Sequence, residues 1–302
     1  MTARSRGLWC AVLGPVLWGV SGNIAQWLFA AKGLRPDWLV AVRLLAAGCL
    51  LMGWCLVTKR QETLGLVRRP KLLLQAFGFG LGGVVVSQFS YFSAVATSNA
   101  PTTTVLQYLG PLFIVVYLAI RFRHWPRRVD VVSLLIAFVG ILLLVTHGQL
   151  TQLALTPRGL FWGVMAGLGA ALYTLLPVHL LQVVSAQVVI AWAMLFAGIM
   201  LAPILVLTPA PTLTAPVVMG IGYVTLFGTL LAYLLYLASL KSVAPTVVGM
   251  LNVFEPLVAT LVAVVCFHDH FGGAEILGGL LVLSTSFIQI LPTKVNKHAL
   301  AH

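Results

Sequence analysis

Long apolar runs constrain this chain more than any other feature of its sequence. Ten stretches of about 20 mainly apolar residues follow one another, each bounded by charged residues, proline or glycine. As a helix, such a stretch is long enough to cross the hydrocarbon layer of a bilayer. We predict spans near residues 7–30, 38–57, 72–96, 101–120, 129–145, 159–181, 187–207, 215–240, 245–267 and 272–291.

The composition agrees with a membrane environment. Hydrophobic residues make up 60% of the 302 residues and charged residues 8%, and the mean hydropathy is +1.04. In a soluble domain, roughly a quarter of all residues are charged, and these residues cover its surface. We therefore expect an all-α integral membrane protein with ten transmembrane helices, located as a multi-pass protein in the inner (cytoplasmic) cell membrane, with the lipid bilayer as its main solvent.

The net charge of +12 indicates topology rather than a nucleic-acid partner, because the basic residues form short clusters between apolar runs. If the N-terminus is cytoplasmic, 14 of the 18 Lys and Arg fall in cytoplasmic segments. The exceptions are Lys32, Arg35, Arg43 and Arg158. The excess of positive charge on the cytoplasmic side predicts that both termini lie there.

Neither a cofactor nor a metal is expected. The four cysteines lie in apolar stretches without the spacing of a zinc site, and His268, Asp269 and His270 make a poor metal cage. Gly78, Gly80 and Gly83 match a dinucleotide fingerprint but sit in a predicted span without a preceding strand, so we interpret them as close helix packing.

The two halves of the chain resemble each other. The Ala100-Pro101-Thr102 segment leads to Gln107 and Gly110-Pro111-Leu112, and a similar segment leads from Ala244-Pro245-Thr246 to Asn252 and Glu255-Pro256-Leu257. The offset is 144 residues before a one-residue slip and 145 after it. We predict two five-span repeats, residues 1–150 and 151–302. Because five is an odd number, the second repeat is inverted relative to the first.

The order of these features resembles the EamA-type transporters of the drug/metabolite transporter superfamily, over nearly the whole chain. The residues that carry the resemblance are Trp18-Gly19, Arg43, Pro101, Pro245 and Glu255-Pro256. The resemblance implies a ten-span fold with a central cavity between the halves, and export of amino acids or related metabolites. The chain departs from its own symmetry where Gly110-Pro111 stands opposite Glu255-Pro256, so a role of that acid is not duplicated.

Two prolines interrupt predicted spans near the bilayer midplane, and we expect helix kinks at Pro111 and Pro256. A proline cannot donate to the carbonyl four residues earlier, so the carbonyls of Gln107 and Asn252 are expected to be free. Such carbonyls at the midplane favour the lining of a cavity, and simple kinking against neighbouring helices is the alternative.

Glu255 is the only acid deep inside a predicted span. Burial of a carboxylate is costly unless it is protonated, paired or wet, so the residue is a candidate for proton coupling or for binding a substrate amine. The alternative is a structural acid satisfied by hydroxyls and backbone amides. Arg43 lies shallower; it either gates the site or binds a carboxylate, or it snorkels to the outer interface.

Aromatic and amide side chains recur through the spans, and those near the midplane are candidates for a substrate cavity. These candidates are Trp18, Gln88, Tyr91, Gln107, Tyr173 and Asn252.

These observations predict a secondary transporter, not an enzyme, that exports a small organic metabolite by alternating access around a midplane cavity. The alternative from another class is a membrane-embedded enzyme acting on a lipid or isoprenoid substrate, but the chain has only six acids and they do not cluster. A passive channel is a third alternative, which the internal repeat and the asymmetry at Glu255 disfavour. The sequence leaves open the substrate identity, the direction of transport, the coupling ion, the oligomeric state and whether Glu255 is functional or structural.

Overall fold

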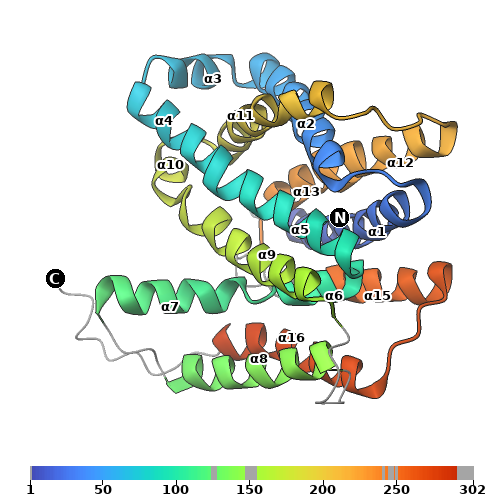
Figure 1. Cartoon of the computed structure of the whole chain (residues 1–302). Coiled ribbons are helices and arrows are strands. Elements are labelled where there is room, and N and C mark those ends of the chain that lie inside the picture. Colours follow the sequence, from blue (N-terminus) through green and yellow to red (C-terminus); the bar gives the residue numbers. More distant parts are fainter. Residues whose placement is uncertain are drawn as a thin grey trace.

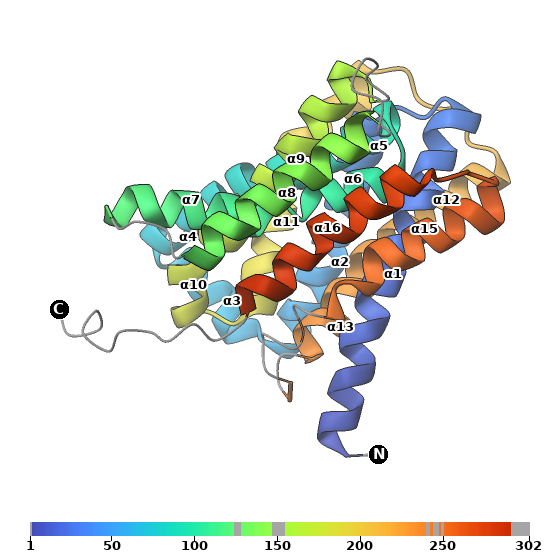
Figure 2. The ribbon, with the colours of Figure 1, turned by 90° about the horizontal axis from the view of Figure 1, so that it is seen from below.

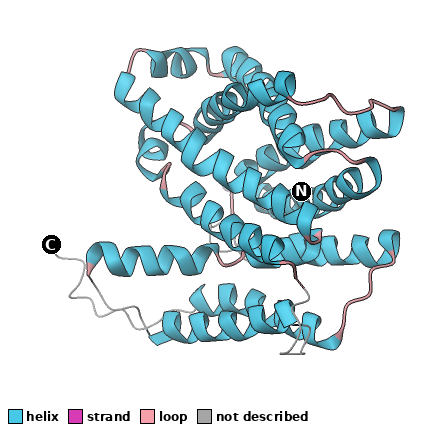
Figure 3. Cartoon of the chain, in the orientation of Figure 1, coloured by secondary structure: helices cyan, strands magenta, loops and turns pink. Residues whose placement is uncertain are grey.

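The structure, a computed structural model, describes residues 2–123, 128–146, 155–239, 242–243, 248 and 251–290. In this part of the chain every regular element is a helix and no strand occurs, so the all-α prediction is confirmed (Figure 3). The helices are α1 (Ala3–Lys32), α2 (Pro36–Thr58), α3 (Arg60–Val67), α4 (Pro70–Phe79), η1 (Gly80–Val85), α5 (Val86–Thr97), α6 (Ala100–Gln107), α7 (Gly110–Phe122), α8 (Arg128–Thr146), α9 (Pro157–Leu175), α10 (Val178–Val183), α11 (Ala186–Leu207), α12 (Ala215–Thr225), η2 (Leu226–Leu231), α13 (Ala232–Ser239), α15 (Phe254–Phe267) and α16 (Gly273–Ile290).

Seven helical stretches of the described chain are long and apolar enough to cross a membrane. They are Arg4–Lys32, Pro36–Thr58, Pro70–Thr97, Ala100–Arg121, Pro157–Val183, Ala186–Leu207 and Ala215–Tyr236, and three shorter apolar helices are Val131–Leu144, Phe254–Phe267 and Gly273–Thr285. Each overlaps a predicted span. The first part of the predicted span 245–267 lies mostly outside the described residues, and the short helix α3 was not predicted.

Two of the long stretches contain a π-helical segment, η1 between α4 and α5 and η2 between α12 and α13. In η2 the Thr229 hydroxyl donates to the carbonyl of Val224, five residues earlier, at 2.8 Å. A π-helical turn shifts the register of the side chains that follow it and is frequent at functional sites. Apolar periodicity does not predict these segments.

The expected kinks at the two prolines take the form of helix starts. Pro111 lies in the first turn of α7, which two residues, Tyr108 and Leu109, separate from α6, and Pro256 is the third residue of α15. Proline is tolerated in a first turn because the N–H groups there have no helical partner. The expectation of a free carbonyl at Asn252 is wrong, since the Glu255 backbone N–H donates to it at 2.9 Å in a tighter turn.

The helices α2 and α11 cross in close contact and run antiparallel. A Cβ on Gly48 would lie 2.7 Å from the backbone nitrogen of Leu195, and one on Gly198 would lie 2.5 Å from the Cα of Leu45. Along the contact, residue numbers therefore rise in α2 while they fall in α11. Buried apolar residues of both helices form the largest hydrophobic cluster of the molecule, which also takes in parts of α1, α4, α5 and α12.

A second antiparallel pair, α8 and α16, lies along one side of the bundle (Figures 1 and 2). A Cβ on Gly140 would lie 2.8 Å from the carbonyl oxygen of Gly278, and the reverse distance is 2.6 Å. The pair contacts the rest of the bundle through α6 and α7.

Helix α1 packs between elements of the second half. Gly14 of α1 lies against Tyr236 of α13, and Ser21 lies against Gly228 of η2, so α1 and α13 run antiparallel. With α15 the order is parallel, because Gly19 lies against Glu255 and the Asn23 amide donates to the carbonyl of Ala259 at 3.0 Å.

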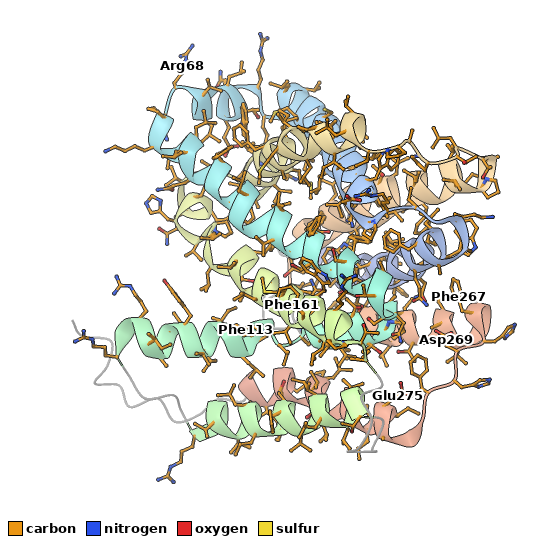
Figure 4. The ribbon with its side chains drawn as sticks, viewed as in Figure 1. Arg68, Phe113, Phe161, Phe267, Asp269 and Glu275 are labelled. Carbon is orange, nitrogen blue, oxygen red and sulfur yellow. The ribbon has the colours of Figure 1, made fainter. Side chains whose placement is uncertain are left out.

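The charged ends of the bundle are separated in space. Figure 4 shows Arg68, in the connection between α3 and α4, at the opposite end of the bundle from Asp269 and Glu275. The latter two lie at the turn between α15 and α16. The apolar helices run between these ends, as expected of segments that span a bilayer.

Candidate functional site

Tyr233 of α13 stands at the centre of a polar and aromatic cluster. Its hydroxyl accepts a hydrogen bond from the Gln88 amide of α5 at 3.4 Å, and its side chain interacts with that of Tyr173 of α9. The ring centroids of Tyr233 and Tyr173 lie 6.2 Å apart. One side chain thus joins three helices that are far apart in the sequence.

Trp18 of α1 completes the aromatic part of this cluster. Its ring meets Tyr233 edge-on with a centroid distance of 5.2 Å, and its centroid lies 5.7 Å from that of Tyr236. Tyr236 in turn interacts with the side chain of Asn252, whose Oδ1 atom is enclosed without a partner in the described chain. Aromatic rings of this kind supply apolar contact area together with polar edges.

Glu255 lies beside this cluster at the start of α15. A Cβ on Gly19 of α1 would lie 2.6 Å from the Glu255 carbonyl oxygen, so only a glycine allows this approach. The Glu255 side chain keeps part of its surface accessible and has neither an ion pair nor a hydrogen bond with any described side chain. It interacts electrostatically with Tyr91, Tyr108 and Tyr233. No hydroxyl or backbone N–H of a described residue donates to this carboxylate.

Arg43 of α2 does not snorkel to the interface, contrary to one of our expectations. The residue is 3% exposed, and its Nε atom donates to the hydroxyl of Thr229 in η2 at 3.0 Å. Its guanidinium carbon lies 4.4 Å from the centroid of the Phe92 ring. The guanidinium turns inward because η2 offers a hydroxyl and α5 an aromatic face, which together replace part of its hydration.

Two tyrosines interact with both the buried cation and the acid. Tyr91 and Tyr233 each interact electrostatically with both Arg43 and Glu255. Tyr91 is 7% exposed and its hydroxyl is hydrogen-bonded to that of Thr104, 3.2 Å away. Arg43 and Glu255 therefore belong to one polar network, although no ion pair joins them in the described chain.

The structure brings most of the predicted site residues into this network. Trp18, Gln88, Tyr91, Tyr173, Asn252, Glu255 and Arg43 each touch it through a contact described above. Gln107 makes no side-chain hydrogen bond within the described residues, and no contact ties it to Tyr233.

Sequence reasoning missed the central role of Tyr233 and Tyr236, and it missed Thr229. The two tyrosines stand three residues apart, which places them on one helix face, but Leu234 and Leu235 beside them favour an interpretation as packing. Thr229 shows no sequence signal for its contact, because that contact depends on the π-helical register of η2.

The described residues offer no metal site. No group of three His, Cys, Asp or Glu side chains among them comes close enough to hold an ion, and His268, Asp269 and His270 form no such group.

Comparison with known proteins decides the family. The model of the EamA-like transporter family matches residues 5–146 and residues 157–291. The chain belongs to the EamA-like transporter family. This assignment agrees with the resemblance found in the sequence, and it points to a multi-pass membrane transporter rather than an enzyme acting on lipids or isoprenoids.

Relatives of this family cover almost the entire chain. The uncharacterized inner membrane transporter YicL of Salmonella typhimurium is 28% identical over 99% of this chain and 100% of its own length. Protein PecM of Dickeya dadantii is 23% identical, covering 92% of this chain and 90% of its own. A protein crystal structure superposes with a TM-score of 0.61 at 18% identity, over 95% of this chain and 97% of that one, which shows a shared fold.

Proposed function

We propose that this chain is a secondary transporter that exports a small organic metabolite, an amino acid or a related compound, by alternating access. The observation that carries the proposal is the polar and aromatic network around Tyr233 and Glu255, in which side chains of both halves meet. A deep carboxylate without a partner in the described chain is expensive in a membrane, and function is the usual reason to retain it.

The second part of the proposal is a ten-span fold of two inverted repeats, residues 1–150 and 151–302. Seven long and three short apolar helices of the described chain match the number of predicted spans. The left-handed residues that end α7 and α15, Arg123 and His268, stand 145 positions apart, as do Pro111 and Pro256. The segments η1 and η2 begin 146 positions apart.

Helix directions support the inversion. In an alternating up-and-down chain of two five-span units, the second and seventh spans are antiparallel, and so are the first and eighth and the fifth and tenth. The pairs α2 with α11, α1 with α13, and α8 with α16 have this direction, and α1 with α15 is parallel as the first and ninth spans would be. The separate family matches to the two halves agree with a repeat.

The orientation in the membrane follows from charge. Arg68 and the other basic residues between α2 and α4 lie at one end of the bundle, and the positive-inside rule assigns this end to the cytoplasm. Both termini are then cytoplasmic. Asp269 and Glu275 lie at the outer end in this orientation.

Glu255 is the proposed site of proton coupling. A carboxyl group that is neutral when protonated can lie in an apolar bundle in one state and pair with a substrate amine or release its proton in another. Such a change alters the cost of exposing the site to each side of the membrane, which is how a proton gradient drives a carrier.

Solute counterflow in proteoliposomes tests the function. The purified full chain is reconstituted, the vesicles are loaded with one unlabelled metabolite at a time, and the uptake of the same labelled metabolite is recorded. We expect transient accumulation for at least one amino acid or related compound, well above protein-free vesicles. If a broad metabolite panel gave protein-free rates throughout, the proposal of a metabolite carrier would be wrong.

A further inference from the structure

Arg43 is a buried cation without a carboxylate partner among the described side chains. Five of the six acids have described side chains, and none of these carboxylates forms an ion pair with Arg43; Asp37 pairs with Arg35 at the start of α2. An unpaired charge in the interior is costly, and the cost falls when an anion binds it. The counter-ion of Arg43 is therefore missing from the described chain.

The hydrogen-bonding capacity of Arg43 is mostly unused. A guanidinium carries five N–H donors, and only the Nε donor has an acceptor in the described chain, the Thr229 hydroxyl. The two Nη atoms have no hydrogen-bond partner in the described chain and are not completely enclosed. They retain a little accessible surface, although the residue as a whole is 3% exposed. The unused donors are thus not fully sealed off in this conformation.

The surroundings of Arg43 suit a planar anion. The ring of Phe92 covers the guanidinium at 4.4 Å, which holds the cation by its face and leaves the N–H groups at its edge. The hydroxyl-bearing side chains of Tyr91 and Tyr233 lie within electrostatic range of the charge. A guanidinium edge matches the two oxygens of a carboxylate, and hydroxyl groups nearby can donate to the same oxygens.

We propose that Arg43, with the hydroxyl groups of Tyr91 and Tyr233, binds the carboxylate of a small organic substrate. The inference rests on the proposed function and adds the group of the substrate that is recognised and the residues that hold it. Thr229 is a positioning residue, since it fixes Nε and thereby the direction of the free edge. The aromatic cluster of Trp18, Tyr233 and Tyr236 then contacts the apolar body of the same substrate.

A binding assay with a matched pair of probes tests this subsite. The purified full chain in lipid nanodiscs is titrated with phenylacetate and with its neutral analogue phenylacetamide, and binding is followed by quenching of tryptophan fluorescence. We expect phenylacetate to bind at least about tenfold more tightly, as a charge-assisted pair implies. Arg43→Gln should abolish this preference, Arg43→Lys should keep a reduced preference, and Arg35→Gln, which removes an exposed arginine, should leave it unchanged.

Thr229→Val provides a variant that keeps the cation. Loss of the positioning hydroxyl should weaken phenylacetate binding several-fold and leave phenylacetamide binding unchanged. All variants are checked for a monodisperse elution profile and a cooperative thermal transition, so that a misfolded protein is not counted. Equal affinity of the wild type for both probes, or an unchanged preference in Arg43→Gln, would overturn the subsite. So would complete displacement of phenylacetate by millimolar chloride, which would indicate an inorganic anion.

Transport of the probes separates this inference from the proposed function. If phenylacetate binds through Arg43 but no compound of the metabolite panel shows counterflow, the subsite stands and the carrier function fails. If the transported compounds all lack an acidic group and Arg43→Gln carries them at the wild-type rate, the function stands and the subsite fails.

Discussion

The Gln88 amide donates a hydrogen bond to the Tyr233 hydroxyl at 3.4 Å, and the two residues stand 145 positions apart, at the offset of the sequence repeat. They lie just after η1 and η2 respectively. The contact therefore joins corresponding positions of the two halves. In a carrier whose halves move relative to each other, such a contact at the centre is one that changes during the cycle.

Tyr233→Phe removes the hydroxyl and keeps the ring that packs on Trp18. We expect the counterflow rate to fall by about tenfold or more, because the partly buried Gln88 amide loses its acceptor at the contact between the two halves. The thermal unfolding temperature should change little, since the ring contacts remain. Tyr117→Phe serves as the control, because Tyr117 is 50% exposed on α7. Equal losses of rate in both variants would contradict a specific role of Tyr233.

Two glycines of α2 should respond in opposite ways to the same substitution. In Gly48→Ala the new methyl group meets the backbone of α11 at 2.7 Å, so the helices must separate at a cost of about 1–3 kcal/mol. In Gly53→Ala nothing lies within 4 Å of the new methyl group, and alanine favours a helix by up to about 1 kcal/mol over glycine. Thermal unfolding in detergent should show a lower midpoint for the first variant and an unchanged or higher midpoint for the second.

The carboxylate of Glu62 in α3 caps α11. It accepts hydrogen bonds from the Ser185 backbone N–H at 2.5 Å and from the Ser185 hydroxyl at 2.8 Å. Glu62→Gln removes the charge that favours a helix N-terminus, and we expect a loss of about 1 kcal/mol in the free energy of unfolding. Asp269→Asn is the control, because this acid has no side-chain partner in the described chain. If the midpoint of thermal unfolding fell equally in both variants, a specific cap by Glu62 would be ruled out.

Much of the fold could be predicted because lipid imposes it. A helix that crosses a bilayer needs a long apolar run, and these runs were visible to within a few residues of the observed ends, as at 38–57 against Pro36–Thr58. The helix α3 was missed because its eight residues are half polar and too short for this pattern. The segments η1 and η2 were missed because a change of hydrogen-bond register leaves the apolar composition unaltered.

The site was predictable in kind but only partly in position. Glu255 stood out because a carboxylate in a span is costly. The aromatic and amide residues were candidates because they are predicted to lie near the bilayer midplane. The centre of the network, Tyr233, was not singled out, because the approach of α1, α5, α9 and α13 to one point is a tertiary relationship. Arg43 shows the same limit, since its inward direction depends on Thr229 and Phe92.

The most direct test of the account is the response of transport to a proton gradient in the wild type and in Glu255→Gln. Proteoliposomes carrying either protein are assayed for uptake of a compound identified by counterflow, with and without an imposed pH difference. We predict that the gradient accelerates uptake by the wild type and leaves Glu255→Gln unaffected, because glutamine cannot bind and release a proton. A wild-type rate that ignores the gradient, together with a variant that behaves as the wild type, would contradict a coupling role of Glu255.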